Sequence, residues 1–471
     1  MSKRIVAGFA AAIVAVAGVA AENTAPRAAP RSIFEQDLAL RSLVAGYKAA
    51  FTCSAYFIAG RSLDDIAGDE LNRIYPDYRE TFASLPDVMI DDAAKTVSVA
   101  YAEGAPARIA AWRPFFGCAQ LPTGAGPAAA DDLPRLADLD PPSAPKPLPK
   151  ADETRAELEA ALAAAFDRKT YGVGTETSAA LVVVDGTIVA ERYRRGFGPS
   201  TPQRTWSVAK SIAATVIGAA AEEGLIDVEA PADLEFWCSP MDPRAGVRVD
   251  DLLRMASGLT STAAGNRTDD IYFGGGRVID HAGGDRLVAP PGARWRYANN
   301  DTLLAMRALR ERIGDDEAFW RFPFEAVLHP LGMTDTFLET DWNGDFVMSS
   351  QVWTTARDLA LLGLLYLADG VHEGERILPE GWTDYVASDR GPQPLARRDG
   401  EVRPGYGAQF WLFDERHGLP AGAYAALGNR GQSLVIVPAR NALIVRRGFD
   451  DNGGARFDVA AFASDALAAL D

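Results

Sequence analysis

Short apolar runs near residue 180 are spaced as the two strands of a hairpin. One run covers Ala179–Val184 and the next Thr187–Ala190, and only Asp185-Gly186 separates them. A two-residue Asp-Gly loop suits the tight turn whose backbone twist matches a pair of antiparallel strands. We therefore predict a β-hairpin at this point of the chain.

A second pair of apolar runs lies near the C-terminus. Ser433–Val437 and Ala442–Arg446 flank a turn at Pro438–Asn441, and Phe457–Leu470 continues with helical spacing. Strands thus stand at both ends of residues 151–471, with helical segments between them. This order predicts one antiparallel sheet that both ends complete and that helices flank, an α/β fold with α+β connectivity.

The front of the chain shows a separate pattern. Ser32–Ala50 has apolar residues at helical spacing, Thr96–Tyr101 alternates as a strand does, and a strand-like pattern returns before Cys118. Residues 22–125 are therefore predicted to form a small N-terminal α+β domain. Residues 126–150 are rich in Pro, Ala, Asp and Gly, which is typical of a linker, and a chain of 471 residues is long enough for two domains.

The most apolar of the expected helices follows Ser207. From Ile212 to Ala221 nearly every position is apolar or small, so this helix belongs in a core. Gly224 can adopt the left-handed conformation that closes a helix. Ser207 and Lys210 stand three residues apart at the helix start, which places hydroxyl and amine on the same helical face.

Burial makes Lys210 a candidate for chemistry. A buried ammonium loses its hydration, so its pKa falls, and the neutral amine can accept a proton from a hydroxyl. Ser207, at a helix N-terminus, also has backbone N–H groups nearby that can stabilise negative charge. The Ser-x-x-Lys spacing is not specific by itself, because a second copy, Ser143–Lys146, lies in the proline-rich linker.

The first residues have the composition of an export signal. Met1–Arg4 is basic, Ile5–Ala20 is apolar, and Val19-Ala20-Ala21 offers small residues for cleavage. We predict a signal peptide over residues 1–21 and a periplasmic or secreted protein; a membrane anchor is the alternative, but the run is short for a span. The net charge of −17 argues against nucleic acid as a partner.

The chain has three cysteines and four histidines. Export would place the cysteines in an oxidising compartment, and Cys53 and Cys118 share the N-terminal segment, so we predict a disulfide between them. Cys238, beside Trp237, is predicted to be a buried free thiol. The histidines show no metal-ligand spacing, so we expect neither a metal nor a cofactor.

A second motif, Arg296-Tyr297-Ala298-Asn299-Asn300, follows Pro290-Pro291-Gly292. Ser-x-x-Lys followed by Tyr-x-Asn resembles the serine β-lactamase and penicillin-binding-protein superfamily, most closely its β-lactamase-related hydrolases, such as 6-aminohexanoate-dimer hydrolases and family esterases. The resemblance covers about residues 151–471 and implies a β-lactamase/transpeptidase-like sheet with a helical subdomain. Further stretches support it: Asp251–Leu259, Leu328–Met333 and Thr355–Ala360.

The resemblance also implies roles for the motif residues. Ser207 would be the acylated nucleophile, Lys210 would help to deprotonate it, and Tyr297 would pass protons between the serine and the leaving group. Asn299 would orient Lys210 or the substrate. In the structural alternative, Tyr297 is a core tyrosine whose hydroxyl is hydrogen-bonded, and Asn299 is a turn residue.

The third motif of the superfamily, Lys-Thr-Gly or His-x-Gly, has no equivalent here. The nearest stretch is Ala426-Leu427-Gly428-Asn429-Arg430-Gly431-Gln432. Two registers would place the strand N–H of the oxyanion hole at Asn429 or at Gln432, and we favour Asn429, beside Gly428. Arg430 is either a solvated charge or a replacement cation that grips a substrate carboxylate.

These observations favour an exported serine hydrolase that cleaves an amide or ester bond of a small molecule through an acyl-enzyme. The missing cation of the third motif keeps one alternative open, a non-catalytic relative that binds cell-envelope peptides and uses its N-terminal domain for docking. D-alanyl carboxypeptidase and β-lactamase are further alternatives within the enzyme class. Neither the substrate nor the oligomeric state follows from the sequence.

Overall fold

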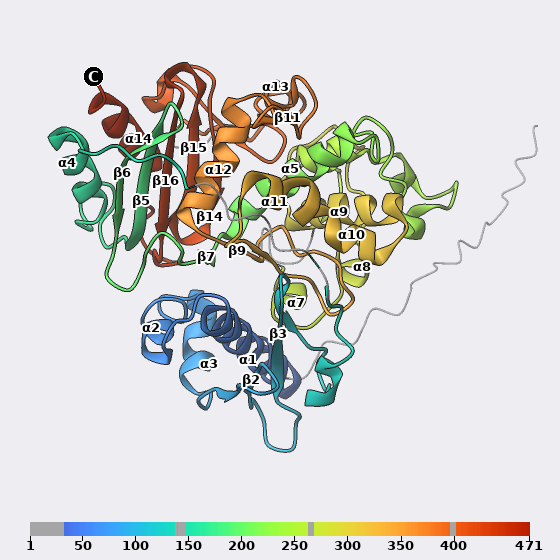
Figure 1. Ribbon diagram of the computed structural model, residues 1–471. Helices are drawn as coiled ribbons and strands as arrows, with labels where there is room; N and C mark the ends of the chain where they lie inside the picture. The colour runs from blue at the N-terminus through green and yellow to red at the C-terminus, as the bar shows by residue number, and fades with distance from the viewer. Residues whose placement is uncertain (1–32, 137–138, 140–146, 262–267, 396–401) are drawn as a thin grey trace, which may run out of the picture.

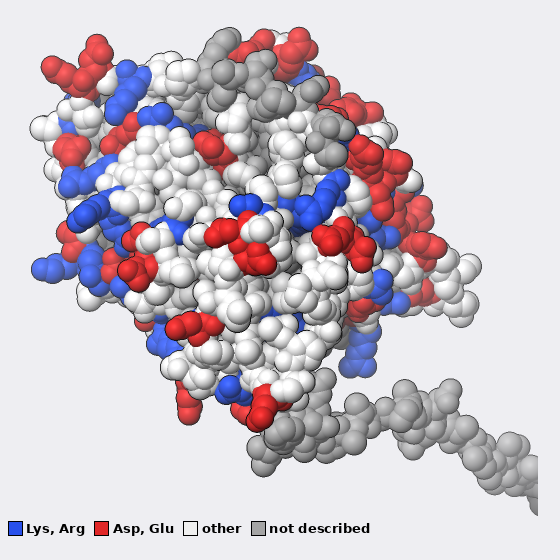
Figure 2. Space-filling model, turned by 60° about the horizontal axis from the view of Figure 1, so that its bottom comes forward, with Lys and Arg blue, Asp and Glu red and all other residues white. Residues whose placement is uncertain are grey.

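The computed structural model describes residues 33–136, 139, 147–261, 268–395 and 402–471 (Figure 1). The predicted signal peptide lies outside these residues. In the described part of the chain, no helix is both long and apolar enough to span a membrane. Figure 2 shows basic and acidic side chains interspersed over the face that bears the N-terminal segment, with acidic atoms denser along one edge.

A seven-stranded antiparallel sheet organises the larger part of the chain. Its strands lie in the order β12-β13-β14-β15-β16-β5-β6, so the first strands of this part pair with the last one. The predicted closure of one sheet by both ends is therefore confirmed. The strand bounds are β5 Thr177–Val184, β6 Thr187–Tyr193, β12 Gly405–Tyr406, β13 Trp411–Phe413, β14 Ala423–Gly428, β15 Gln432–Val437 and β16 Ala442–Gly448.

Both predicted hairpins are present, one on each side of the β16–β5 pair. Strands β5 and β6 meet at Asp185 and Gly186, whose φ angles of 48° and 74° are the two left-handed values that a tight hairpin turn requires. Strands β15 and β16 turn through Asn441, with a φ of 42°. Asparagine tolerates this conformation better than most residues.

Helices cover both faces of the sheet. Alternate residues of β5 point to opposite sides, so Leu181 packs in the main core while Val182 packs in a second core on the other face. Helices α4 (Ala156–Ala165) and α14 (Val459–Ala468) supply that second core. Helices α5 (Ala209–Glu222) and α12 (Ala356–Leu367) lie on the main-core side.

Along the chain, a helical subdomain and short strands follow β6 and precede β12. Its helix α9 packs against α5 and α6, which ties the subdomain to the central helix. The bounds are α6 Val249–Leu253, α7 Asp269–Tyr272, α8 Val278–His281, α9 Asn299–Ile313, α10 Asp316–Pro323, α11 His329–Leu331 and α13 Trp382–Val386, with strands β7 Gln203–Arg204, β8 Phe337–Leu338, β9 Val352–Thr354, β10 Val371–His372 and β11 Glu375–Arg376.

The N-terminal segment forms a helix packed on a four-stranded antiparallel sheet, in agreement with the predicted α+β pattern (Figure 1). Its apolar residues continue the main core: Phe51 and Tyr47 belong to the same cluster as Trp206 and Phe273. The bounds are α1 Ile33–Phe57, α2 Leu63–Gly68, α3 Arg79–Ala83, β1 Met89–Asp91, β2 Thr96–Val99, β3 Arg108–Arg113 and β4 Gly117–Gln120.

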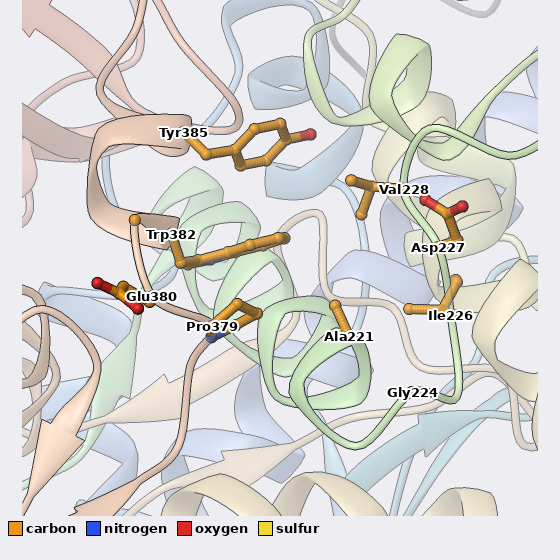
Figure 3. A pocket seen from close by; sticks show the side chains of 10 residues that line it. Ala221, Gly224, Ile226, Asp227, Val228, Pro379, Glu380, Trp382 and Tyr385 are labelled. Atoms are coloured by element: carbon orange, nitrogen blue, oxygen red, sulfur yellow. The ribbon is translucent and has the colours of Figure 1, made fainter.

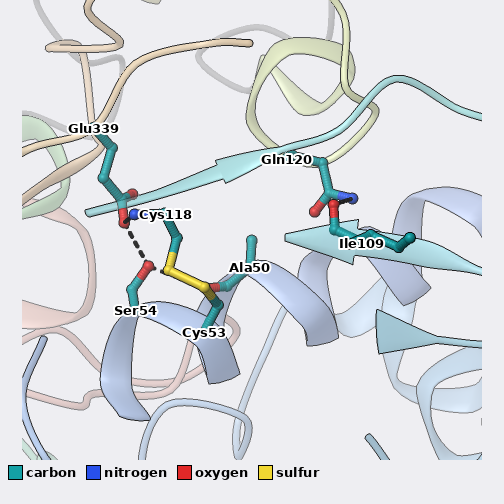
Figure 4. Close-up of a disulfide and its surroundings, with 7 residues drawn as sticks. All are labelled: Ala50, Cys53, Ser54, Ile109, Cys118, Gln120 and Glu339. Atoms are coloured by element: carbon teal, nitrogen blue, oxygen red, sulfur yellow. Dashed lines mark hydrogen bonds between the residues drawn. A yellow bond between two sulfur atoms is a disulfide. The ribbon is translucent and has the colours of Figure 1, made fainter. Parts of the chain in front are cut away.

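The predicted disulfide joins Cys53 of α1 to Cys118 of β4 (Figure 4). Beside it, the Glu339 carboxylate accepts hydrogen bonds from the Ser54 hydroxyl and the Cys118 N–H, which links the bridge to the larger part of the chain. Cys238 is a free thiol, as predicted, but the prediction that it is buried was wrong, because it is exposed. The short helical turn before it buries Trp237, so the next side chain points outward.

Candidate active site

Ser207 lies at the start of the central helix, as the pattern predicted. A single helical turn, Trp206–Val208, leads directly into α5, and the Thr205 N–H donates to the Val352 carbonyl of strand β9 at 2.8 Å. Trp206 has a φ of 51°, a left-handed conformation that for a bulky residue costs about 1–3 kcal/mol. Packing around the buried Trp206 holds this geometry, which leaves Ser207 partly exposed beside it.

Lys210 is buried one helical turn after Ser207, with 1% of its surface exposed. Its Nζ lies 3.1 Å from Ser207 Oγ, 2.7 Å from Asn299 Oδ1 and 2.6 Å from the Ser349 carbonyl oxygen. Burial lowers the pKa of Lys210 well below its usual 10.5. Among the described residues no carboxylate pairs with this amine, so no opposite charge offsets the desolvation cost of its ammonium form.

The ring of Tyr297 lies beside Lys210. The Lys210 amine lies 5.1 Å from the centroid of its ring, and Trp411 stacks on the same ring with centroids 5.6 Å apart. Burial raises the pKa of the Tyr297 hydroxyl, and its hydrogen bond with Ser207 acts in the opposite direction. Tyr297 therefore stays protonated near neutral pH, in contact with the Ser207 hydroxyl.

The structure thus brings Ser207, Lys210, Tyr297 and Asn299 together at one place. Sequence reasoning missed Ser349, whose carbonyl accepts from the Lys210 amine. The Ser349 hydroxyl shares a 2.6 Å hydrogen bond with the Tyr272 hydroxyl, which orders this part of the backbone. A contact through a main-chain carbonyl leaves no signature in the residue type, so no sequence signal was available.

Strand β14 passes directly beside the nucleophile and ends at Gly428. A Cβ at Gly428 would lie 2.3 Å from the Thr205 carbonyl oxygen and 3.2 Å from the Ser207 nitrogen, so only glycine fits. Asn429 follows at once, whereas Gln432 stands on the neighbouring strand with its side chain bonded to the Gly448 carbonyl at 2.6 Å. This placement supports the register in which Asn429 supplies the strand N–H.

Arg430 does not reach the site, so the expectation that it could grip a substrate carboxylate was wrong. Arg430 is 4% exposed, and its guanidinium donates to the carbonyl oxygens of Asp69, Glu70 and Asn72 in the N-terminal segment. A φ of 57° turns the Arg430 side chain away from Ser207 and toward that segment. It is also not a solvated charge, which was the alternative.

Two pockets in the described part of the chain lie apart from Ser207. The one in Figure 3 has a volume of about 460 Å³ and lies at the C-terminal end of α5, lined by Ala221, Trp382 and Tyr385 among others. The other lies beside Asn300, with Asp270, Asp285 and His281 in its wall. No group of metal-ligating side chains occurs in the described part of the chain.

Comparison with known proteins agrees with this geometry. Residues 162–463, more than half of the chain, match the family model described as Beta-lactamase. A 6-aminohexanoate-dimer hydrolase of Paenarthrobacter ureafaciens is 25% identical over 301 residues, 58% of this chain and 72% of that protein.

Solved structures share the fold. One from Bacillus anthracis, assigned as a 6-aminohexanoate-dimer hydrolase, has a TM-score of 0.54 and 23% identity over 70% of this chain and 88% of its own. A penicillin-binding protein homologue from Caulobacter crescentus has a TM-score of 0.54 and 15% identity over 68% of this chain and 99% of its own. With the family model spanning the helix, the sheet and the motifs that meet at Ser207, the protein belongs to the β-lactamase family.

Proposed function

We propose that this protein is an exported serine hydrolase that cleaves an amide or ester bond of a small molecule through an acyl-enzyme on Ser207. One observation carries the proposal: the buried Lys210 amine lies 3.1 Å from the Ser207 hydroxyl oxygen. Its other two partners are neutral oxygens. A buried lysine with this set of partners is poised to be a base rather than a structural cation.

The partners of Lys210 fit a neutral amine. Such an amine has two N–H groups and one lone pair, and the Asn299 and Ser349 oxygens, at 2.7 Å and 2.6 Å, accept the two N–H groups. The lone pair is then left for the Ser207 O–H. In acylation the Ser207 proton moves to Lys210 Nζ while Oγ forms a bond to the substrate carbonyl carbon.

The remaining steps need a proton path and a site for negative charge. The tetrahedral intermediate places its oxyanion between the Ser207 and Asn429 N–H groups. Tyr297 delivers a proton to the leaving amine or alcohol as its bond to carbon breaks, and Lys210 replaces that proton. Water then attacks the acyl carbon by the reverse route, which releases the acid and restores Ser207.

An amide or ester substrate is supported by the chemistry of the site and by the similarity to a 6-aminohexanoate-dimer hydrolase. The third motif carries no lysine or histidine and Arg430 points away, which disfavours substrates that depend on a carboxylate grip, including β-lactams. Export is supported by the Cys53–Cys118 disulfide, because such bridges persist in oxidising compartments.

Covalent labelling tests the proposal directly. We expect a fluorophosphonate, or an activated ester at single turnover, to add one acyl or phosphonyl group to the purified protein, and peptide mass spectrometry to place it on Ser207. These reagents label a serine only when a neighbouring base activates its hydroxyl. An unlabelled Ser207 in folded protein would instead favour the non-catalytic, peptide-binding alternative.

The pH dependence of acylation should report the state of Lys210. Burial disfavours the ammonium form, so the pKa of this amine is lowered and the neutral base appears at lower pH than for a free lysine. The rate constant for ester acylation should therefore rise about tenfold per pH unit and level off at a pH well below 10.5, the ordinary lysine pKa. If the acylation rate instead rises with an apparent pKa of about 10.4, the value of an unperturbed lysine, Lys210 is not the base.

A further inference from the structure

The turn after strand β14 is held by the N-terminal segment. Arg430 donates from Nη1 to the Glu70 carbonyl at 3.0 Å and from Nη2 to the Asp69 and Asn72 carbonyls at 3.0 Å and 2.7 Å. Its Nε donates to the Asp450 carbonyl at 3.1 Å. One guanidinium thus joins a loop of the N-terminal segment to the residues that follow strand β16, beside the turn after β14.

The neighbouring Asn429 is fixed through a second link to the same segment. Its Oδ1 accepts from the Arg430 N–H at 2.9 Å, and its Nδ2 donates to Asn452 Oδ1 at 2.5 Å. Asn452 in turn donates its backbone N–H to the Arg73 carbonyl at 3.2 Å. Both residues of the turn are therefore anchored to residues 69–73.

The N-terminal segment also packs on the residue before the nucleophile. The ring centroids of Phe51 and Tyr75 lie 5.6 Å and 6.2 Å from that of Trp206. Trp206 has the left-handed backbone that sets the direction of the Ser207 N–H. Both N–H groups of the proposed oxyanion hole thus belong to short stretches that the N-terminal segment supports.

From these contacts we infer that the N-terminal segment completes the oxyanion hole, and that Arg430 is the positioning residue that holds the Asn429 N–H in place through residues 69–72. The inference rests on the proposed acyl transfer at Ser207. It assigns residues 33–130, which lie outside the matched family model, a part in the hydrolase itself rather than in docking.

The geometry explains why arginine stands at this position. The planar guanidinium can donate to several carbonyl oxygens in different directions at once. Among the described contacts, these hydrogen bonds of Arg430 are the only ones that a side chain of the turn makes to residues 69–72. Lysine keeps the charge but has one nitrogen, which cannot reach the same set of carbonyls. A displacement of the turn by about 1 Å would cost on the order of 10- to 100-fold in rate.

The test compares Arg430→Lys and Asn452→Ala with a matched control, Arg113→Lys. Arg113 is likewise buried, on β3, and donates to the Pro134 carbonyl and the Thr340 hydroxyl, each at 3.1 Å, away from the turn. Thermal unfolding establishes the folded fraction of each variant. Asn452 is only partly buried, so its substitution keeps the test valid if a buried arginine variant does not fold.

The readout is kcat and KM for a nitrophenyl ester and for its thionoester. Sulfur is a weak hydrogen-bond acceptor, so an intact oxyanion hole favours the oxygen ester. We expect Arg430→Lys and Asn452→Ala to lower kcat about 10- to 100-fold, to leave KM within about threefold, and to reduce the oxygen-to-sulfur preference by about tenfold or more. Arg113→Lys should change stability but not this preference.

Two outcomes would overturn the inference, and they are distinguishable. If the folded wild-type protein is not acylated on Ser207, the proposed function fails and this inference fails with it. If the wild-type protein is acylated and turns over, but the kcat and the oxygen-to-sulfur preference of both variants match those of Arg113→Lys, the proposed function stands and only the role of Arg430 is wrong.

Discussion

Ser207→Ala is expected to lower kcat for an amide or ester substrate by on the order of 10⁶-fold, the loss found when the nucleophile of a serine hydrolase is removed. The reason is that no bond between enzyme and acyl group can form without Oγ. Lys210→Met should have a comparable effect, because the hydroxyl at 3.1 Å then has no base. The double variant should be little worse than either single one, since the two groups act as a unit.

Steady-state hydrolysis of a short-chain nitrophenyl ester measures these losses. Ser211→Ala is the matched control, because Ser211 lies on the same helix and its hydroxyl donates to the Gln409 carbonyl at 2.7 Å, away from the site. The control should retain activity within about threefold once folding is verified, as expected for a residue outside the proton-transfer path. Turnover by Ser207→Ala within tenfold of the wild type would refute the acyl-enzyme on this residue.

Tyr297→Phe is expected to lower kcat about 10²-fold or more while the protein folds normally. The ring is retained, so its stacking on Trp411 and its contact with Tyr406 persist. What is lost is the hydroxyl that contacts Ser207 and carries the proton to the leaving group. The effect should be largest for substrates with poor leaving groups, such as amides, because these depend most on protonation.

A neighbouring tyrosine provides the control for this variant. Tyr406 is buried in the same aromatic cluster, and Tyr406→Phe also removes one hydroxyl without changing the ring. Comparing kcat of the two variants on an anilide and on a nitrophenyl ester separates proton transfer from packing. If Tyr297→Phe loses no more activity than Tyr406→Phe on either substrate, Tyr297 serves the structure alone.

The N-terminal segment is part of the same folded core as the site residues. Its apolar residues share the main core, and its carbonyls bind Arg430. Leu133 and Leu136, in the stretch predicted to be a linker, are also buried. Removal of residues 33–136 would therefore expose apolar core surface next to the nucleophile.

Features that depend on local chemistry could be predicted from the sequence. The Asp185-Gly186 turn, the buried helix after Ser207 and the order of Ser-x-x-Lys and Tyr-x-Asn each follow from neighbouring residues, because strand and helix periods fix which side chains share a face. The Cys53–Cys118 pairing was predicted because the two cysteines share one segment, and the structure contains it.

Features that depend on long-range packing and on backbone direction were visible only in the tertiary structure. The left-handed conformation of Arg430 sends its side chain to residues 69–72, although its place beside the third motif suggested a substrate contact. The Ser349 carbonyl beside Lys210 comes from a residue 139 positions away along the chain. The close approach of Gly428 to the Ser207 nitrogen likewise depends on how β14 packs against the helix start, because sequence separation says nothing about which backbone atoms meet in the folded chain.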